Sequence, residues 1–383
     1  MREGWVEKQL KDVAFVFAGQ SAPQKQEDYS LTGTPFIKAG NLSELISGKN
    51  EDSILKVTDF AVEKYGLKKY KSGSVLFAKS GMSCLKGYVY VTKNDCYVVS
   101  HLAIVQPKED VNSYYLKYHF MYHKPYLLAK DTAYPSISIA DILNYKIILP
   151  KIEKQEQIVS ELDMITEMIS KYDEQLKELD KLSQSIFYEM FGDPIENEKG
   201  WEMSTIEMTC IIKSGNSEAN YSKEGTLPYI KVSDMNLPLN SKYINTYSLS
   251  VDFEQNKKNI IPIGATIFPK RGGAIFTNKK RITNKEICCD LNIMAVIPGI
   301  RIQQEYLYMY FMFIDFSKLP NGSSVPQINN KDIGPLKIAL PPLPLQQSFA
   351  RKIQAIEAMK SKVQEAKKEA ETLLAARMQY WFE

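Results

Sequence analysis

The chain contains an approximate copy of its own sequence. Gly200-Trp201 repeats Gly4-Trp5 at a separation of 196 residues, and from Gly73 and Gly264 onward the separation settles at 191 residues. Solenoid repeats are only about 20–50 residues long, so a period of this length describes two domain-sized halves. The sequence therefore predicts a molecule with two related binding places.

The composition is typical of a globular protein with two or three domains. Of the 383 residues, 44% are hydrophobic and 24% are charged. No stretch approaches the roughly 18–20 apolar residues of a membrane span, and the N-terminus lacks the apolar core of a signal peptide. The five cysteines include no CxxC pair, and an odd count argues against a disulfide framework. We therefore expect a cytoplasmic protein with free thiols and no membrane contact.

Each half begins with a mixed, strand-rich region of about 150 residues and ends with a helix of about 40 residues. The clearest strand patterns are residues 75–78, 87–91, 102–105, 266–268 and 293–296. Residues 114–128 and 305–316 have helical character. The predicted fold class is α+β, with domains at 1–150 and 198–341 and long helices at 151–193 and 342–383.

The long helices carry apolar residues three or four positions apart, which is typical of a coiled coil. The predicted seam residues are Ile158, Leu162, Ile165, Ile169, Leu176, Leu179, Leu182 and Ile186 in the first helix, and Phe349, Ile353, Ile356, Val363 and Leu373 in the second. Charged residues (Lys360, Lys367 and Arg377) interrupt the second seam, where Met359, Ala366 or Leu374 could replace them. Antiparallel pairing would give a pseudo-twofold molecule, with a domain at each end of a rod about 55 Å long.

Motifs for catalysis are absent from the sequence. It has no Walker A motif, no GxGxxG, no GxSxG and no HExxH. His119 and His123 have metal-like spacing, but no cysteine or carboxylate pair nearby completes a site. We therefore expect a binding protein without catalytic residues, metal or a bound cofactor.

Two short segments recur in both halves and could contact a ligand. Residues 79–83 and 270–273 combine basic side chains with glycine after a strand, which suits a phosphate or a guanine edge, although a tight turn explains them too. Residues 134–138 and 324–331 are polar and turn-rich. With the unmatched basic run at 279–281, the candidate nucleic-acid contacts are Lys38, Lys79, Ser80, Gly81, Ser83, Tyr134, Ser136, Lys231, Lys270, Arg271, Gly272, Gly273, Lys279, Lys280, Arg281, Gln327 and Asn329.

The ordered set of features resembles the specificity (S) subunit of type I restriction–modification systems. It consists of the Gly-Trp start of each half, the basic glycine loop, the Ile-Leu-Pro end of the first domain, the glutamine-rich helix start and the spacer at 187–194. The resemblance implies two target-recognition domains that each read half of a bipartite DNA site. It also implies helices that bind two methyltransferase (M) subunits, joined by restriction (R) motor-nuclease subunits. S-adenosylmethionine, ATP and magnesium would then belong to those partners.

Two other functions are compatible with the sequence. The chain could be a two-headed scaffold that binds proteins and not DNA. It could also be the specificity subunit of a related enzyme in which modification and cleavage share one polypeptide.

Overall fold

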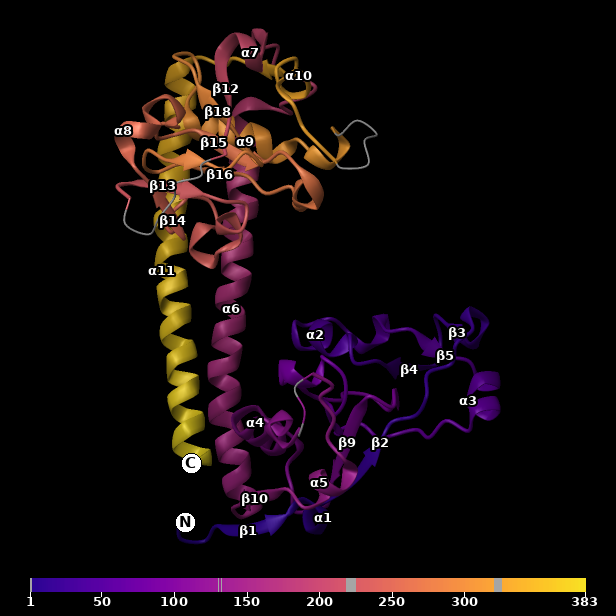
Figure 1. Cartoon of the computed structure of the whole chain (residues 1–383). Coiled ribbons are helices and arrows are strands. Elements are labelled where there is room, and N and C mark those ends of the chain that lie inside the picture. Colours follow the sequence, from indigo (N-terminus) through magenta and orange to yellow (C-terminus); the bar gives the residue numbers. More distant parts are fainter. Residues whose placement is uncertain (1, 130, 132, 218–224, 320–325) are drawn as a thin grey trace. The chain divides into compact units, whose positions relative to one another are not determined.

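The computed structural model describes residues 2–129, 131, 133–217, 225–319 and 326–383. The chain divides into two compact units (Figure 1), which are Met1–Tyr172 with Ala366–Glu383 (unit 1) and Asp173–Glu365 (unit 2). Each unit holds one globular domain and part of each long helix. The predicted domain boundaries, 1–150 and 198–341, do not include the long helices.

Unit 1 is strand-rich, as predicted. Its strands are β1 (Val6–Gln9), β2 (Ala14–Ala18), β3 (Tyr29–Ser30), β4 (Thr34–Ile37), β5 (Lys56–Val57), β6 (Val75–Ala78), β7 (Val89–Val91), β8 (Tyr97–Val98), β9 (Leu102–Pro107) and β10 (Lys146–Leu149). Its α-helices are α1 (Leu10–Val13), α2 (Asn41–Ile46), α3 (Asp59–Tyr65), α4 (Ser113–His123), α5 (Ile139–Leu143) and the first part of α6 (Ile152–Phe191).

Unit 2 follows the same plan. Its strands are β11 (Met203–Thr205), β12 (Cys210–Ser214), β13 (Leu227–Ile230), β14 (Leu249–Val251), β15 (Thr266–Pro269), β16 (Arg281–Ile282), β17 (Cys288–Cys289), β18 (Ile293–Pro298) and β19 (Lys337–Ala339). Its α-helices are α7 (Ile206–Thr209), α8 (Phe253–Asn256), α9 (Gln304–Phe313), α10 (Asn330–Ile333) and the first part of α11 (Leu343–Phe382). β15, β18 and α10 begin 191 residues after β6, β9 and α5, so the repeat in the sequence is a repeat of structure.

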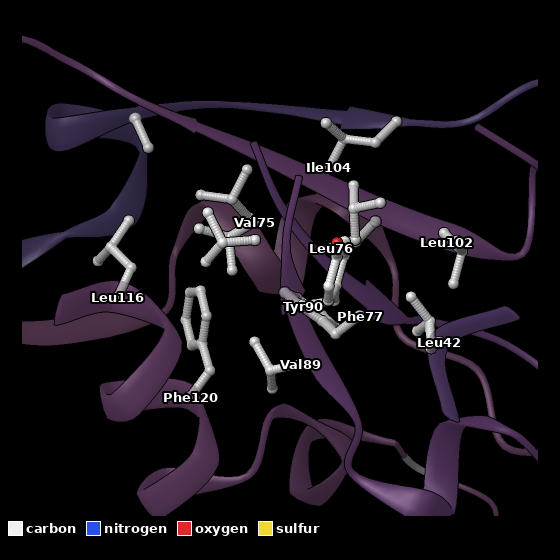
Figure 2. Close-up of a cluster of buried hydrophobic side chains, with 14 of the residues drawn as sticks. Leu42, Val75, Leu76, Phe77, Val89, Tyr90, Leu102, Ile104, Leu116 and Phe120 are labelled. Carbon is white, nitrogen blue, oxygen red and sulfur yellow. The ribbon is translucent and has the colours of Figure 1, made fainter. Parts of the chain in front are cut away.

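A four-stranded antiparallel sheet forms the centre of each domain. Its order is β2-β9-β6-β7 in unit 1 and β12-β18-β15-β16 in unit 2. The central strands β6 and β15 are buried throughout, which explains the apolar sequence of β6 and the single polar residue, Thr266, in β15. Figure 2 shows Leu116 and Phe120 of α4 facing the sheet of unit 1, and the Phe77 and Phe120 ring centroids lie 5.3 Å apart. This packing fixes the end of β6, where the first candidate loop begins.

The two long helices run antiparallel. In unit 1, Ile158 and Leu162 of α6 share a core cluster with Phe382 of α11. In unit 2, Phe187 of α6 packs edge-on against Phe349 of α11, with ring centroids 5.6 Å apart. The beginning of each helix therefore lies beside the end of the other. The heptad spacing predicted that the two helices pair, and the pairing is antiparallel. Gly192, with a φ of 78°, ends α6 in a left-handed conformation that favours glycine.

Charged residues also lie along the helix pair. Lys360 binds Asp180 with an Nζ–Oδ1 distance of 2.6 Å. Arg377 binds Glu161, which also accepts a hydrogen bond of 2.9 Å from the Trp381 indole. The hydrogen bond from Arg377 holds the pKa of the Glu161 carboxyl below its usual value. These ion pairs explain how α11 tolerates basic residues in its seam.

The seam prediction is wrong at two positions, Leu182 and Leu373, which are exposed. Ser183 and Phe187 are buried in α6 in place of Leu182. From Leu179 onward the inward-facing residues follow one another at intervals of four, so the buried face of the helix includes positions 183 and 187 but not 182. Leu374 packs against the core in place of its neighbour Leu373. The remaining predicted seam residues are buried or half-buried, namely Ile158, Leu162, Ile165, Ile169, Leu176, Leu179, Ile186, Phe349, Ile353, Ile356 and Val363.

A buried glutamine joins each domain to the start of its helix. Gln155 accepts a hydrogen bond from the Asn112 amide (2.9 Å) and donates to the carbonyls of Asp110 (3.1 Å) and Pro150 (2.9 Å). Gln346 makes the corresponding three bonds in unit 2, at 2.8–3.0 Å. Both side chains are fully buried, so they hold each helix start in one orientation against its own domain.

We expect Leu162→Ala to destabilise the protein by about 2–5 kcal/mol, because the side chain is fully buried and its removal leaves a cavity. Met164→Ala is the matched control, since Met164 lies on the same helix but is 62% exposed. The free energy of unfolding, measured by urea denaturation, tests both variants. Equal stability of Leu162→Ala and the parent would contradict the assigned packing.

Candidate nucleic-acid interface

The two recurring segments predicted as ligand contacts pair with each other in unit 1. The Ile137 amide donates to the Lys79 carbonyl (2.7 Å), and the Gly81 amide donates to the Pro135 carbonyl (2.9 Å). Between these bonds Ser80 lies opposite Ser136 in a short antiparallel β-bridge. We call residues 79–83, 101 and 134–137 the bridge site of unit 1.

Unit 2 repeats this arrangement 191 residues later. The Ile328 amide donates to the Lys270 carbonyl (2.9 Å), and the Gly272 amide donates to the Pro326 carbonyl (2.8 Å). Arg271 then lies opposite Gln327. Residues 270–273, 292 and 326–329 form the bridge site of unit 2. Ser324 and Val325, which belong to the predicted segment, lie outside the described residues.

A third strand end, which was not among the predicted contacts, completes each bridge site. The Lys79 amide donates to the His101 carbonyl (2.9 Å), and the Lys270 amide donates to the Asn292 carbonyl (2.8 Å). His101 is exposed, and its Nδ1 lies 2.9 Å from Ser80 Oγ. His101 and Asn292 are 191 residues apart, so the repeat in the sequence could have identified them as equivalent positions.

Side chains alternate between the two faces of each bridge. Ile137 and Ile328 point into the domain cores and are at most 1% exposed. The bridge partners themselves point outward, because neighbouring residues of an extended strand face opposite sides. Arg271 and Ser136 are exposed accordingly, and the site therefore presents polar side chains to solvent.

Glycine has a structural role at both sites. Gly81 and Gly272 have φ values of 76° and 70°, which other residues rarely adopt, so the tight-turn interpretation is correct for these two. A Cβ built on Gly81, Gly272 or Gly273 would meet no atom within 4 Å. The outer surface of the loops is therefore open to a ligand.

The lysines that precede these glycines are not equivalent, which corrects the prediction for Lys270. Its side chain is 8% exposed and donates to Ser214 Oγ (2.8 Å), and burial lowers its pKa. The residue aligned with Ser214 in unit 1 is Ala18, which has no hydroxyl group to hold Lys79. Lys79 remains half-exposed and makes no side-chain hydrogen bond or ion pair within the described residues. Of these two lysines, Lys79 is the one whose ammonium is available to bind a phosphate.

The basic run at 279–281 is mainly structural. Lys280 is fully buried, donates to the Ile314 carbonyl (2.8 Å) and lies 4.2 Å from the Phe316 ring centroid. Burial lowers the pKa of Lys280 to about 8. Arg281 donates to the Met235 carbonyl (3.0 Å), and Lys279 binds Asn236. Lys280 and Arg281 are therefore wrong as predicted DNA contacts, because the Lys280 ammonium is buried and both terminal nitrogens of Arg281 donate to backbone carbonyls of the same domain.

The other candidates surround the bridge sites or support neighbouring turns. Lys38 is half-buried over the Tyr29 ring (4.6 Å to the centroid) and follows Ile37, whose carbonyl accepts a hydrogen bond from the Val99 amide. Tyr134 is 84% exposed. The remaining positions belong to turns or helix starts: Lys231 precedes a 3₁₀ turn, Ser83 precedes another, and Asn329 begins α10 and accepts from Gln327 Nε2.

Metal-binding and thiol chemistry are not evident in the described ranges. No group of three or more His, Cys, Asp or Glu side chains there could hold a metal ion, and all five cysteines are free and buried. His119 is buried beside His123, with ring centroids 4.5 Å apart, and its desolvation lowers its pKa to about 3. The histidine pair therefore belongs to the aromatic core. Within the same ranges, none of the helices is long and apolar enough to cross a membrane.

Comparison with known protein families identifies the two halves. A model of the type I restriction modification DNA specificity domain matches residues 2–180 and again residues 198–371. The chain belongs to this family. It is thus a specificity subunit of type I restriction–modification, a non-catalytic component that recognises DNA sequence.

Two specificity subunits are similar to this chain over most of its length. The putative type I restriction enzyme MjaX specificity subunit of Methanocaldococcus jannaschii is 25% identical across 97% of this chain and 93% of its own length. The MjaVIII specificity subunit of that organism is 21% identical, over 90% of this chain and 85% of its own.

Two solved structures share the fold. The type I restriction–modification S subunit from M. genitalium has a TM-score of 0.56 at 14% identity, covering 99% of this chain and 96% of its own. A chain from a structural study of complex assembly and conformational transition in a type I system has a TM-score of 0.59 at 19% identity, covering 99% and 97%.

The different surroundings of Lys79 and Lys270 predict different effects on DNA binding. Lys79→Ala should weaken binding to all sequences alike and reduce the salt slope by about one, because one phosphate contact is lost. Lys270→Ala should leave the slope unchanged and lower the melting temperature, because its ammonium already binds Ser214. Fluorescence anisotropy over a range of salt concentrations tests both variants. A reduced slope for Lys270→Ala would contradict the assignment.

Proposed function

We propose that each domain of this specificity subunit reads one half of an asymmetric, bipartite site in double-stranded DNA. The observation that carries the proposal is the bridge site, which occurs once in each unit with the same backbone hydrogen bonds and with different outward side chains. Sequence is read from base edges by side chains of this polar kind. Two domains with different side chains would read two different half-sites.

We further propose that the long helices set the distance between the half-sites and bind the methyltransferase subunits, two to each specificity subunit. Apolar side chains on the outer surface of both helices support a partner there. Met164 and Met168 of α6 are 62% and 45% exposed, and Met359 of α11 is 53% exposed. Exposed apolar side chains on otherwise charged helices, such as the neighbouring Met164 and Met168, are typical of protein contacts.

The remaining activities would reside in the partners, and the complete assembly would work in the cytoplasm. Methyltransferase subunits would bind S-adenosylmethionine and methylate adenine. Restriction subunits would use ATP and magnesium to cleave unmodified DNA. The chain itself would supply target selection to that assembly.

Electrophoretic mobility shift of the full chain, with and without its methyltransferase subunits, tests the proposal. We expect the chain to form a specific complex with DNA that contains the sequence methylated in the genome. The affinity for this DNA should be higher when the methyltransferase subunits are present. A two-headed protein-binding scaffold would instead form a complex with the partner subunits and give no shift of any DNA. That result would contradict the proposed function.

The helices predict a spacer that changes with helix length. Helices α6 and α11 have 40 residues each and are therefore about 60 Å long, which corresponds to about 18 base pairs of DNA. Insertion of one heptad into both helices should lengthen the spacer of the methylated motif and leave both half-sites unchanged. A spacer of unchanged length, determined by sequencing methylated DNA, would show that the helices do not set the distance.

A further inference from the structure

The outward bridge partners occupy one defined position in each domain. Ser80 and Ser136 form a pair in which neither residue hydrogen-bonds to the other, and the same is true of Arg271 and Gln327. Across such a pair the Cβ atoms are about 4.5–5.5 Å apart and both side chains project from the same face. Two outward side chains so close together can contact neighbouring base pairs.

We propose that this outward pair determines base specificity in each domain, and that in unit 2 Arg271 reads a guanine while Gln327 reads an adenine. The inference rests on the proposed function and adds the positions and the chemistry of recognition. A guanidinium group donates two parallel hydrogen bonds to the O6 and N7 atoms of guanine. Gln327 Nε2 donates one of its two hydrogens to Asn329 Oδ1 (2.5 Å), so its second hydrogen and its Oε1 atom remain for the N7 and N6 atoms of adenine.

Arg271 is available for such a contact. It is exposed and makes no side-chain hydrogen bond or ion pair with any residue that the structure describes. Two other arginines of unit 2 are engaged within the domain: Arg301 binds Glu202 (3.0 Å), and Arg281 donates to the Met235 carbonyl (3.0 Å). An arginine without a protein partner, held on a hydrogen-bonded backbone, is suited to an external acceptor.

The backbone around Arg271 allows a base edge to approach. Gly272 and Gly273 follow it directly, and a Cβ at either position would meet nothing within 4 Å. Lys270, the neighbour on the other side, points inward to Ser214. The guanidinium group therefore projects from a surface without competing side chains on its own loop.

Unit 1 presents a different set of groups on the same backbone. Ser80 and Ser136 have short hydroxyl side chains, and Ser80 Oγ lies 2.9 Å from His101 Nδ1. The aligned residue in unit 2, Asn292, is instead bound to Asp290 (2.5 Å). The first domain therefore reads its half-site through two hydroxyls and an imidazole, and cannot make the paired contacts of Arg271 and Gln327.

The experiment is selection of binding sites from a randomised double-stranded DNA library by the full chain with its methyltransferase subunits. Arg271→Lys keeps the charge but loses the planar fork, and it should reduce discrimination at one guanine of the second half-site by about five- to hundredfold. Gln327→Ala should do the same at one adenine. Both variants should leave the first half-site unchanged.

Two control variants test whether misfolding or loss of charge, and not loss of base contacts, explains a changed motif. Arg271→Ser with Gln327→Ser gives unit 2 the residues that the same backbone carries in unit 1, so it should fold and lose both preferences. Lys331→Ala removes an exposed charge from α10 nearby and should leave the motif unchanged. Thermal melting confirms that each variant is folded.

The outcomes separate this inference from the proposed function. If the wild type selects a split site and the folded Arg271 and Gln327 variants select the same one, the assigned pair is wrong and the proposed function stands. If the wild type selects no sequence, the proposed function itself fails. The converse change, Ser80→Arg with Ser136→Gln, should add guanine and adenine preferences to the first half-site only.

Discussion

The arrangement of each bridge site depends on hydrogen bonds between backbone atoms. Because amide and carbonyl groups are the same in nearly every residue, these bonds survive changes of side chain that would break a site built from side-chain contacts. The amide-to-carbonyl bonds from Ile137 to Lys79 and from Ile328 to Lys270 differ by only 0.2 Å in length. Each domain thus keeps one shape while the outward residues vary, which is what a protein needs to change its target without refolding.

The outward residues can vary, whereas the inward residues of the same backbone must remain apolar. Ile137 and Ile328 are buried in the domain cores and hold the bridge against the end of the central sheet. The buried glutamines Gln155 and Gln346 extend this order to the helix starts through three hydrogen bonds each. Loss of either amide would leave buried backbone groups without partners, which costs about 1–3 kcal/mol for each group. The two units therefore share the same hydrogen-bonding arrangement from the loops to the starts of the long helices.

Sequence periodicity was sufficient to predict the repeat, the central strands and the antiparallel helix pair. The 191-residue register and the heptad spacing report on burial, and burial dominates those elements. Recognition of the family likewise came from an ordered set of segments. In contrast, Leu182 and Leu373 were misassigned, because a one-residue drift of the apolar stripe depends on how the two helices pack.

Individual contacts depended on details that one sequence does not reveal. Lys79 and Lys270 are aligned, but a hydroxyl at position 214 and a methyl group at position 18 give them different environments. Lys280 looked like part of a basic surface, whereas its ammonium binds a carbonyl group and faces an aromatic ring in the core. Charge along the chain indicates an external partner only when the fold leaves that charge exposed.

Two domains with one backbone geometry are proposed to read two different half-sites. Single-molecule sequencing of methylated adenines, in cells that carry this chain with its methyltransferase subunits, tests this proposal. We expect one motif made of two unlike short half-sites separated by a spacer of fixed length and unspecified sequence. A palindromic or uninterrupted motif would contradict it.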